Sequence, residues 1–99
     1  MSKEAYIREA ETTSGYGDRI VLYYFTNEKK IHTSDGIVTK YGVGIIMYTQ
    51  SPNERTRREK KSVEGIFRTK EEAERFADVL CNGLVTPITL DDIVADAVV

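Results

Sequence analysis

The pattern of apolar and polar residues changes about two-thirds of the way along the chain. Before that point apolar residues come in short runs or alternate with polar ones, with Gly, Asn, Asp and Ser clustered between the runs. A period of two is typical of β-strands, because successive side chains of a strand point to opposite faces. After that point apolar residues recur every three or four positions, which is the period of an amphipathic helix. Strands followed by helices predict an α+β fold.

The first part of the chain predicts an antiparallel sheet of about four strands. We expect strands over residues 5–13, 20–25, 38–50 and 55–67, with a short returning strand over 30–33. Turns are expected where Gly, Pro, Asn, Asp and Ser cluster, over residues 14–18, 27–29, 34–36 and 51–53. The run from Ile20 to Phe25 is apolar or aromatic throughout, which is typical of a central strand covered on both faces.

Two glycines interrupt the apolar pattern of the strand expected over 38–50. Alternation places one set of side chains on one face, namely Tyr41, Val43, Ile45 and Met47, and gives the other face Gly42, Gly44, Ile46 and Tyr48. A glycine inside a strand marks a bend, a bulge or the close approach of another element. We therefore expect a helix packed against Gly42 and Gly44. The alternative is a ligand groove there, as in a small enzyme or a small-ligand carrier.

The strand expected over 55–67 is polar, and its first half, residues 57–61, contains no apolar residue. Such a strand fits the edge of a sheet, where exposed charges guard against unwanted pairing. Val63 and Ile66 break strict alternation, and a bulge over 64–65 would bring both onto one face.

The last third of the chain predicts one long helix packed on the sheet. Thr69 is an N-cap residue, and Glu72 three residues later completes a capping box. The apolar stripe of this helix is Ala73, Phe76, Ala77 and Leu80. We expect the helix to end at Gly83 in the left-handed conformation, with Leu84 folded back on Val79.

A short C-terminal helix follows a link that contains Pro87. We expect Thr89 to cap this helix with Asp92 as its box partner, and Ile88 to form a hydrophobic staple with Ile93. The apolar stripe is Leu90, Ile93, Val94 and Ala97. The long helix should cover one face of the sheet. The other face is then solvated, covered by the C-terminal helix, or buried against a second molecule.

Size and composition fit one domain over residues 1–99. The chain has 40% hydrophobic and 30% charged residues, which are ordinary values for a globular protein. Its formal net charge of −2 argues mildly against a protein that grips duplex DNA. A single cysteine, no signal-peptide pattern and no stretch of ~20 apolar residues predict a reduced, cytoplasmic protein without a membrane segment.

The closing segment resembles that of a family of small, uncharacterised bacterial proteins. Residues 86–94, Thr-Pro-Ile-Thr-Leu-Asp-Asp-Ile-Val, are similar to the family's Ser/Thr-Pro-Ile-x-Leu-x-Asp-Ile/Val ending. The segment Tyr41-Gly42-Val43 and the residue Asn82 are similar too, so the resemblance spans Ile20 to Val94. This family is a domain of unknown function common in anaerobic Gram-positive bacteria. The resemblance implies the strand-then-helix fold and carries no established activity, cofactor or catalytic residue.

Reactive side chains are few, and each has a structural interpretation. The cluster of Asp91, Asp92 and Asp96 could ligate a cation, but no recognisable loop supplies further oxygen ligands, and carboxylates at a helix start stabilise the helix. His32 is the only histidine and has no nucleophile partner in its expected turn. Cys81 ends the long helix, where a thiolate is disfavoured. We therefore predict no catalytic residue, no metal and no cofactor, and a protein that is not an enzyme.

The one concentrated charge feature is a basic run in the polar strand, made of Arg55, Arg57, Arg58, Lys60 and Lys61. On a strand Arg57 and Lys61 project to one side, while Arg58 and Lys60 project to the other. The run is interpreted as a solvated edge. Contact with an acidic protein partner or with nucleic acid is the functional alternative.

Tyrosines concentrate on the expected central strands, and Tyr23, Tyr41 and Tyr48 are candidate interface residues because tyrosine is enriched at interfaces. Without a reactive constellation, the leading prediction is a non-enzymatic protein-binding or regulatory module. Its partner would be another protein or, in a homodimer, a second copy. The alternative is nucleic-acid binding through the basic strand 55–61.

Overall fold

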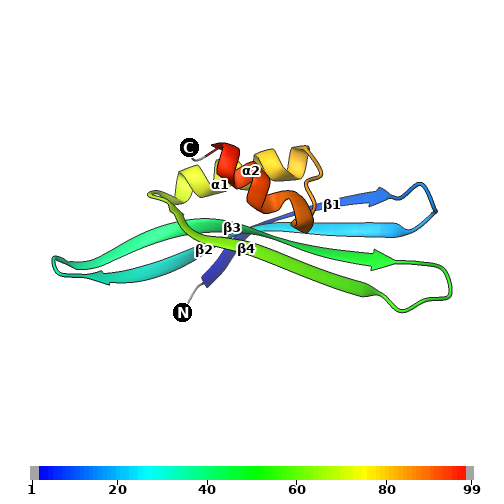
Figure 1. Cartoon of the computed structure of the whole chain (residues 1–99), viewed down its shortest axis with the longest axis horizontal. Helices are drawn as coiled ribbons and strands as arrows, with labels where there is room; N and C mark the ends of the chain where they lie inside the picture. Colours follow the sequence, from blue (N-terminus) through cyan, green and yellow to red (C-terminus); the bar gives the residue numbers. More distant parts are fainter. Residues whose placement is uncertain (1–2, 98–99) are drawn as a thin grey trace.

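A four-stranded antiparallel sheet carries two helices on one of its faces in the computed structural model, which describes residues 3–97 (Figure 1). The strands are β1 (Lys3–Thr13), β2 (Arg19–Thr33), β3 (Gly36–Gln50) and β4 (Arg57–Phe67). Helix α1 (Lys70–Asn82), the 3₁₀ turn η1 (Pro87–Thr89) and helix α2 (Leu90–Ala97) follow. Each strand pairs with the next, so the order in the sheet is β1-β2-β3-β4. The predicted α+β architecture is confirmed.

Strands β2 and β3 form one long hairpin with an unbroken register. The turn expected over 27–29 is therefore wrong, as is the separate short strand over 30–33, and the chain reverses at Ser34-Asp35. Asn27 stays in the strand because Gly42 opposite it has no side chain, which leaves room for the buried amide. The polar residues that follow lie where the hairpin extends beyond the helices and meets solvent (Figure 1).

The core lies between the sheet and the two helices. Alternate side chains of the central strands meet the inner faces of α1 and α2, and the buried set is Leu22, Tyr24, Val43, Ile45, Ala73, Ala77, Leu80, Leu90 and Val94. A fully buried Leu, Ile or Val contributes about 1.5–3 kcal/mol relative to an exposed one. The Tyr24 hydroxyl donates a hydrogen bond to the carbonyl of Val85 at 2.8 Å, which ties the sheet to the link between α1 and η1.

A bulge in β4 turns apolar side chains toward this core. Tyr41 pairs with Phe67 and Val43 pairs with Val63. The segment 63–67 of β4 therefore lies opposite the shorter segment 41–43 of β3, and the extra residues of β4 form the bulge. Gly65 inside the bulge has a φ of 68°, a left-handed conformation that glycine adopts without strain. The side chains that the bulge packs against the core are Val63, Ile66 and Phe67. The predicted bulge is confirmed.

Helix α1 begins at Lys70 and ends at Asn82 as predicted, but the left-handed residue after it lies one position later than predicted. The Thr69 hydroxyl accepts a hydrogen bond from the N–H of Glu72 at 3.2 Å. At the other end Gly83 has a φ of −89°, and Leu84 takes the left-handed conformation instead, with a φ of 50°. The N–H groups of Leu84 and of Val85 donate to carbonyls in the last turn of α1, both at 3.1 Å. This is the Schellman pattern moved by one residue, and it turns Val85 toward the core.

The C-terminal helical part also starts earlier than predicted. Pro87 opens η1, because its missing N–H and fixed φ suit the first position of a helical turn. Thr89 therefore lies inside the turn, and its hydroxyl donates to the carbonyl of Thr86 at 3.1 Å rather than capping α2. Ile88 is 85% exposed, so the expected staple onto Ile93 is wrong.

Candidate functional site

The face of the sheet opposite the helices is called the open face here, and no helix within residues 3–97 covers it (Figure 1). Directly opposed residues of antiparallel strands share a face, so the register shows which side chains line up across it. One row, read from β1 to β4, is Glu9, Tyr23, Ile46 and Lys60. The next row is Glu11, Val21, Tyr48 and Arg58. Each row runs from an acid on β1 through two apolar or aromatic residues to a base on β4.

The middle of the open face forms a hollow of about 200 Å³, lined by Glu4, Ile7, Tyr23, Phe25, Ile46 and Tyr48. The rings of Tyr23 and Tyr48 meet edge to face, with their centroids 5.9 Å apart and their planes at 86°. Such a pair contributes about 0.5–1.5 kcal/mol beyond the area that it buries. Ile7 at the rim is 62% exposed. The hollow is therefore mainly apolar, with an aromatic wall and one carboxylate.

Phe25 also belongs to the open face, yet it is only 2% exposed. Its ring lies over Gly44, where an added Cβ would clash with the ring. The ammonium of Lys60 lies 5.3 Å from the ring centroid and 2.7 Å from a carboxylate oxygen of Glu4. A base from one edge of the sheet and an acid from the other edge thus close over Phe25.

The other glycine inside β3, Gly42, makes room for the Asn27 side chain. The Asn27 amide nitrogen donates to the carbonyl of Val63 at 3.4 Å, and a Cβ at position 42 would clash with both groups. The amide oxygen of Asn27 is buried without a hydrogen-bond partner in the described chain. The helix expected against the two glycines is wrong, because Gly42 and Gly44 point away from α1 and α2. The alternative was a ligand groove at these glycines, and that space is filled by Asn27 and Phe25 of β2.

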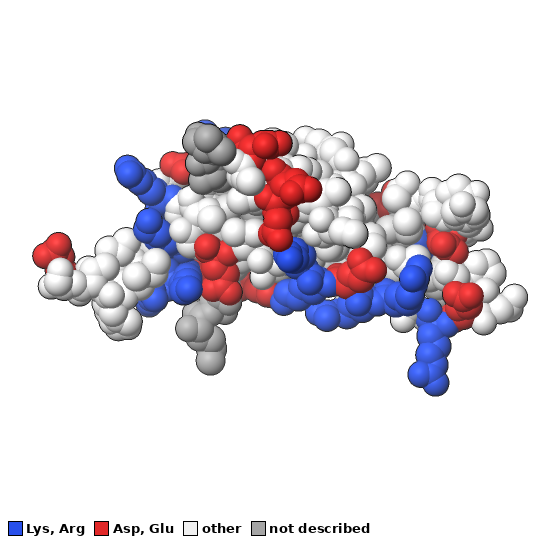
Figure 2. Space-filling view, viewed as in Figure 1, with Lys and Arg blue, Asp and Glu red and all other residues white. Residues whose placement is uncertain are grey.

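The five basic residues singled out in the sequence do not form one patch. As alternation predicts, Arg57 and Lys61 lie on the helix side, and Arg58 and Lys60 lie on the open face. Arg55 lies in the connection before β4. The ammonium of Lys61 is 3.0 Å from the carboxylate of Asp91 on α2, an ion pair that is half exposed. Figure 2 shows Lys and Arg side chains along β4 with acidic groups beside them.

The chain matches one known family over nearly its whole length. A family of unknown function, DUF6514, covers residues 3–99. The chain belongs to DUF6514. No curated protein and no solved structure matches it. The DUF6514 match extends beyond the resemblance seen between Ile20 and Val94, since it includes β1.

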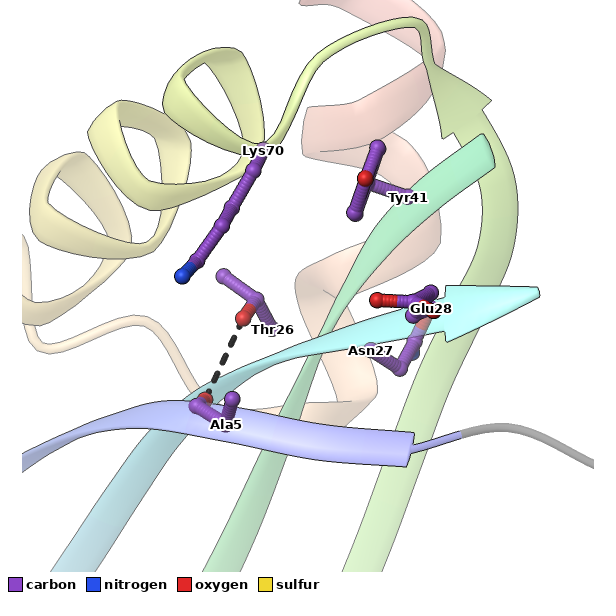
Figure 3. Close-up of a pocket in the computed structure, with 6 residues that line it drawn as sticks. All are labelled: Ala5, Thr26, Asn27, Glu28, Tyr41 and Lys70. Carbon is purple, nitrogen blue, oxygen red and sulfur yellow. Dashed lines mark hydrogen bonds between the residues drawn. The ribbon is translucent and has the colours of Figure 1, made fainter. Parts of the chain in front are cut away.

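Tyr41, the third candidate interface tyrosine, lies apart from Tyr23 and Tyr48 in this DUF6514 chain. It is on the helix side, where it helps to form a cavity of about 100 Å³ lined by Ala5, Thr26, Asn27, Glu28, Tyr41 and Lys70. Figure 3 shows Lys70 reaching in from the start of α1, with the Thr26 hydroxyl donating to the carbonyl of Ala5 at 3.2 Å. A volume of this size holds about three water molecules. It is too small for most cofactors.

One contact cluster between β1 and α1 was not predicted from the sequence. The Tyr6 hydroxyl donates to a carboxylate oxygen of Asp78 at 2.9 Å, and the guanidinium of Arg8 lies 3.3 Å from the other oxygen. The same guanidinium stacks over the Tyr6 ring at 4.0 Å from its centroid. The hydrogen bond to Asp78, and then burial, raises the pKa of Tyr6. No local sequence pattern predicts this cluster, because Tyr6 and Asp78 are 72 residues apart.

The remaining chemical candidates stay separate from one another. His32 is exposed near the end of the β2–β3 hairpin, and Cys81 is half buried on α1. Within residues 3–97, no three His, Cys, Asp or Glu side chains are grouped to hold a metal ion. In the same part of the chain, no helix is long and apolar enough to cross a membrane.

Proposed function

We propose that this DUF6514 protein is a non-enzymatic protein-binding module that acts in regulation or assembly, and that the open face is its contact surface. The observation that carries the proposal is the side-chain content of that face. Tyr23, Ile46 and Tyr48 lie partly exposed at its centre, and charged residues line both edges. Protein interfaces share this anatomy, with an aromatic, apolar centre and a polar rim.

Folding alone does not explain this surface. The core is already formed on the helix side without Tyr23 and Tyr48, which stay partly exposed on the open face. A solvated face of an antiparallel sheet ordinarily carries polar residues at alternate positions. The cytoplasmic location, and the anaerobic Gram-positive setting implied by the resemblance, belong to the same proposal.

Site-specific photo-crosslinking tests the proposal. A photoreactive phenylalanine analogue replaces Tyr48, and a control protein carries it at Tyr16, which is 95% exposed in the β1–β2 turn. The expected result is a discrete protein adduct from position 48 that position 16 does not give. If position 48 gives no adduct beyond the control, the open face is not a protein contact surface.

Nucleic-acid binding is the second candidate function. It is favoured by the pairing of Arg58 with Tyr48 across β3 and β4. A positively charged side chain beside an aromatic ring suits single-stranded nucleic acid, because the charge attracts the phosphates and the ring stacks on a nucleobase. Fluorescence anisotropy with a labelled single-stranded oligonucleotide tests it. Binding should weaken with salt and weaken further when Arg57, Arg58, Lys60 and Lys61 become Ala. Absence of binding at low salt rejects this candidate.

A further inference from the structure

The two rows of the open face are self-complementary. Each reads acid, apolar, apolar, base, from Glu9 to Lys60 in one row and from Glu11 to Arg58 in the next. Consider a second copy of the sheet whose open face lies against the first. A two-fold axis between the two faces, parallel to the strands and midway between β2 and β3, relates the copies and reverses the order of the strands in the second one. Each row then lies over the same row of the second copy, which runs in the opposite direction. Acids lie over bases at both ends, and apolar or aromatic residues lie over one another in the middle.

We propose that the partner of the open face is a second copy of this chain, related by that two-fold axis. The inference rests on the proposed function and names its partner. In the dimer β1 of each copy lies over β4 of the other. Glu11 then faces Arg58 of the partner subunit, and Glu9 faces Lys60 of the partner subunit. Because Lys60 already has an ion pair with Glu4 of its own chain at 2.7 Å, the contact between Glu11 and Arg58 carries most of the charge argument. Tyr23, Ile46 and Tyr48 of the two copies form the centre.

Charge decides between this axis and the other way of stacking two open faces. A two-fold axis perpendicular to the strands would lay β1 over β1 and β4 over β4. With that axis between the two rows, Glu9 would face Glu11 of the partner subunit, and Lys60 would face Arg58 of the partner subunit. Like charges brought together cost free energy and suppress wrong pairings. The parallel axis is therefore the geometry that the charges favour.

The area available sets the expected strength. With strands about 4.8 Å apart and about 3.3 Å per residue, four strands and roughly eight residues give a face of roughly 500 Å². Two such faces bury roughly 1,000 Å² in total, which is at the lower limit for a specific interface. The dimer should be reversible on dilution. Its charged rim should make it weaker at high salt.

Charge reversal with light scattering tests the geometry. Glu11→Lys and Arg58→Glu are made singly and together, and Arg75→Glu on the exposed side of α1 is the control. Glu11 has an exposed ion pair with Arg19 at 2.7 Å, so circular dichroism should show that the variants stay folded. The mass of the natural chain should rise with concentration toward twice 11.2 kDa. The control should behave in the same way.

Each single reversal should weaken dimerisation about tenfold, since it brings like charges together at both ends of a row. The double variant should recover most of this loss, because its acid and base have exchanged places. The two single variants, when mixed, should form a heterodimer. A natural chain that stays monomeric at every concentration overturns the inference, as does a double variant weaker than either single one. If the chain is monomeric but position 48 crosslinks to a different protein, the proposed function survives and this inference does not.

Discussion

The Lys60 ammonium on β4 lies 2.7 Å from the Glu4 carboxylate on β1, and together the two side chains close over the Phe25 ring. The two residues come from opposite edges of the sheet and are 56 positions apart. This contact crosses the open face. The two side chains help to bury the Phe25 ring on the face of the sheet that has no helix.

Lys60→Ala should lower the free energy of unfolding by about 0.5–1.5 kcal/mol, since the methylene chain of lysine covers apolar surface as well as carrying charge. Lys60→Met is the matched control, because it keeps the cover and loses the charge. If the cover matters most, the control should stay within about 0.5 kcal/mol of the natural protein, as exposed ion pairs contribute little. Urea unfolding measures both. Equal losses for the two variants would show that the ion pair, not the cover, stabilises the fold.

Gly44→Ala should destabilise the protein by about 1–3 kcal/mol, because the added Cβ meets the Phe25 ring. Gly15→Ala is the control, since no atom of the described residues that could obstruct it lies within 4 Å of a Cβ at that position, and it should change stability by about 0.5 kcal/mol or less. Phe25→Leu combined with Gly44→Ala should cost less than the sum of the two single changes. Additive costs would contradict the packing of the ring on the glycine.

Leu84→Gly should stabilise the protein by about 0.5–1 kcal/mol, which is unusual for the loss of a large apolar residue. Leu84 is left-handed with a φ of 50° and is 43% exposed, so glycine relieves strain while removing little burial. Leu84→Ala, which keeps the strain, should give no such gain. Thermal unfolding monitored by circular dichroism compares them. A glycine variant less stable than the alanine variant would contradict the left-handed helix end.

Stability should fall in alkali because of two tyrosines. Burial raises the pKa of Tyr24, and the hydrogen bond to Asp78 raises the pKa of Tyr6, both from an ordinary value of 10.0. Above pH 10 the unfolded chain loses these protons more readily than the folded chain, so each rise in pH favours unfolding. Below that range the contribution is constant. Urea unfolding between pH 8 and 11 should show the decline, and Tyr24→Phe should flatten it. An unchanged slope in the variant would contradict the burial of that hydroxyl.

Local signals in the sequence predicted elements well and their ends less well. The Thr69 cap, the α1 stripe and the β4 bulge could be predicted because each depends on residues a few positions apart. The turn over 27–29 was predicted wrongly because a run of polar residues, here Asn, Glu and Lys, is typical of a turn but also occurs in a solvent-exposed strand. They lie in a hairpin that passes beyond the helices, and Asn27 fits against a glycine of another strand.

The candidate site depends on pairing that no single strand contains. Alternation alone separates Arg58 from Lys61, and this part of the site was predicted correctly. The acid-to-base rows need the register of all four strands, and the Tyr6–Asp78 contact needs the packing of α1 on β1. The two glycines were assigned to a helix contact because a strand pattern does not reveal which face the helices cover.

An NMR dilution series tests most directly whether the open face joins two copies of this protein. Backbone amide shifts of Tyr23, Ile46 and Tyr48 should move with concentration, while those of the buried helix residues Ala73 and Ala77 stay fixed. High salt should reduce the change. A spectrum that does not depend on concentration, or one in which only helix residues move, would contradict a dimer through the open face.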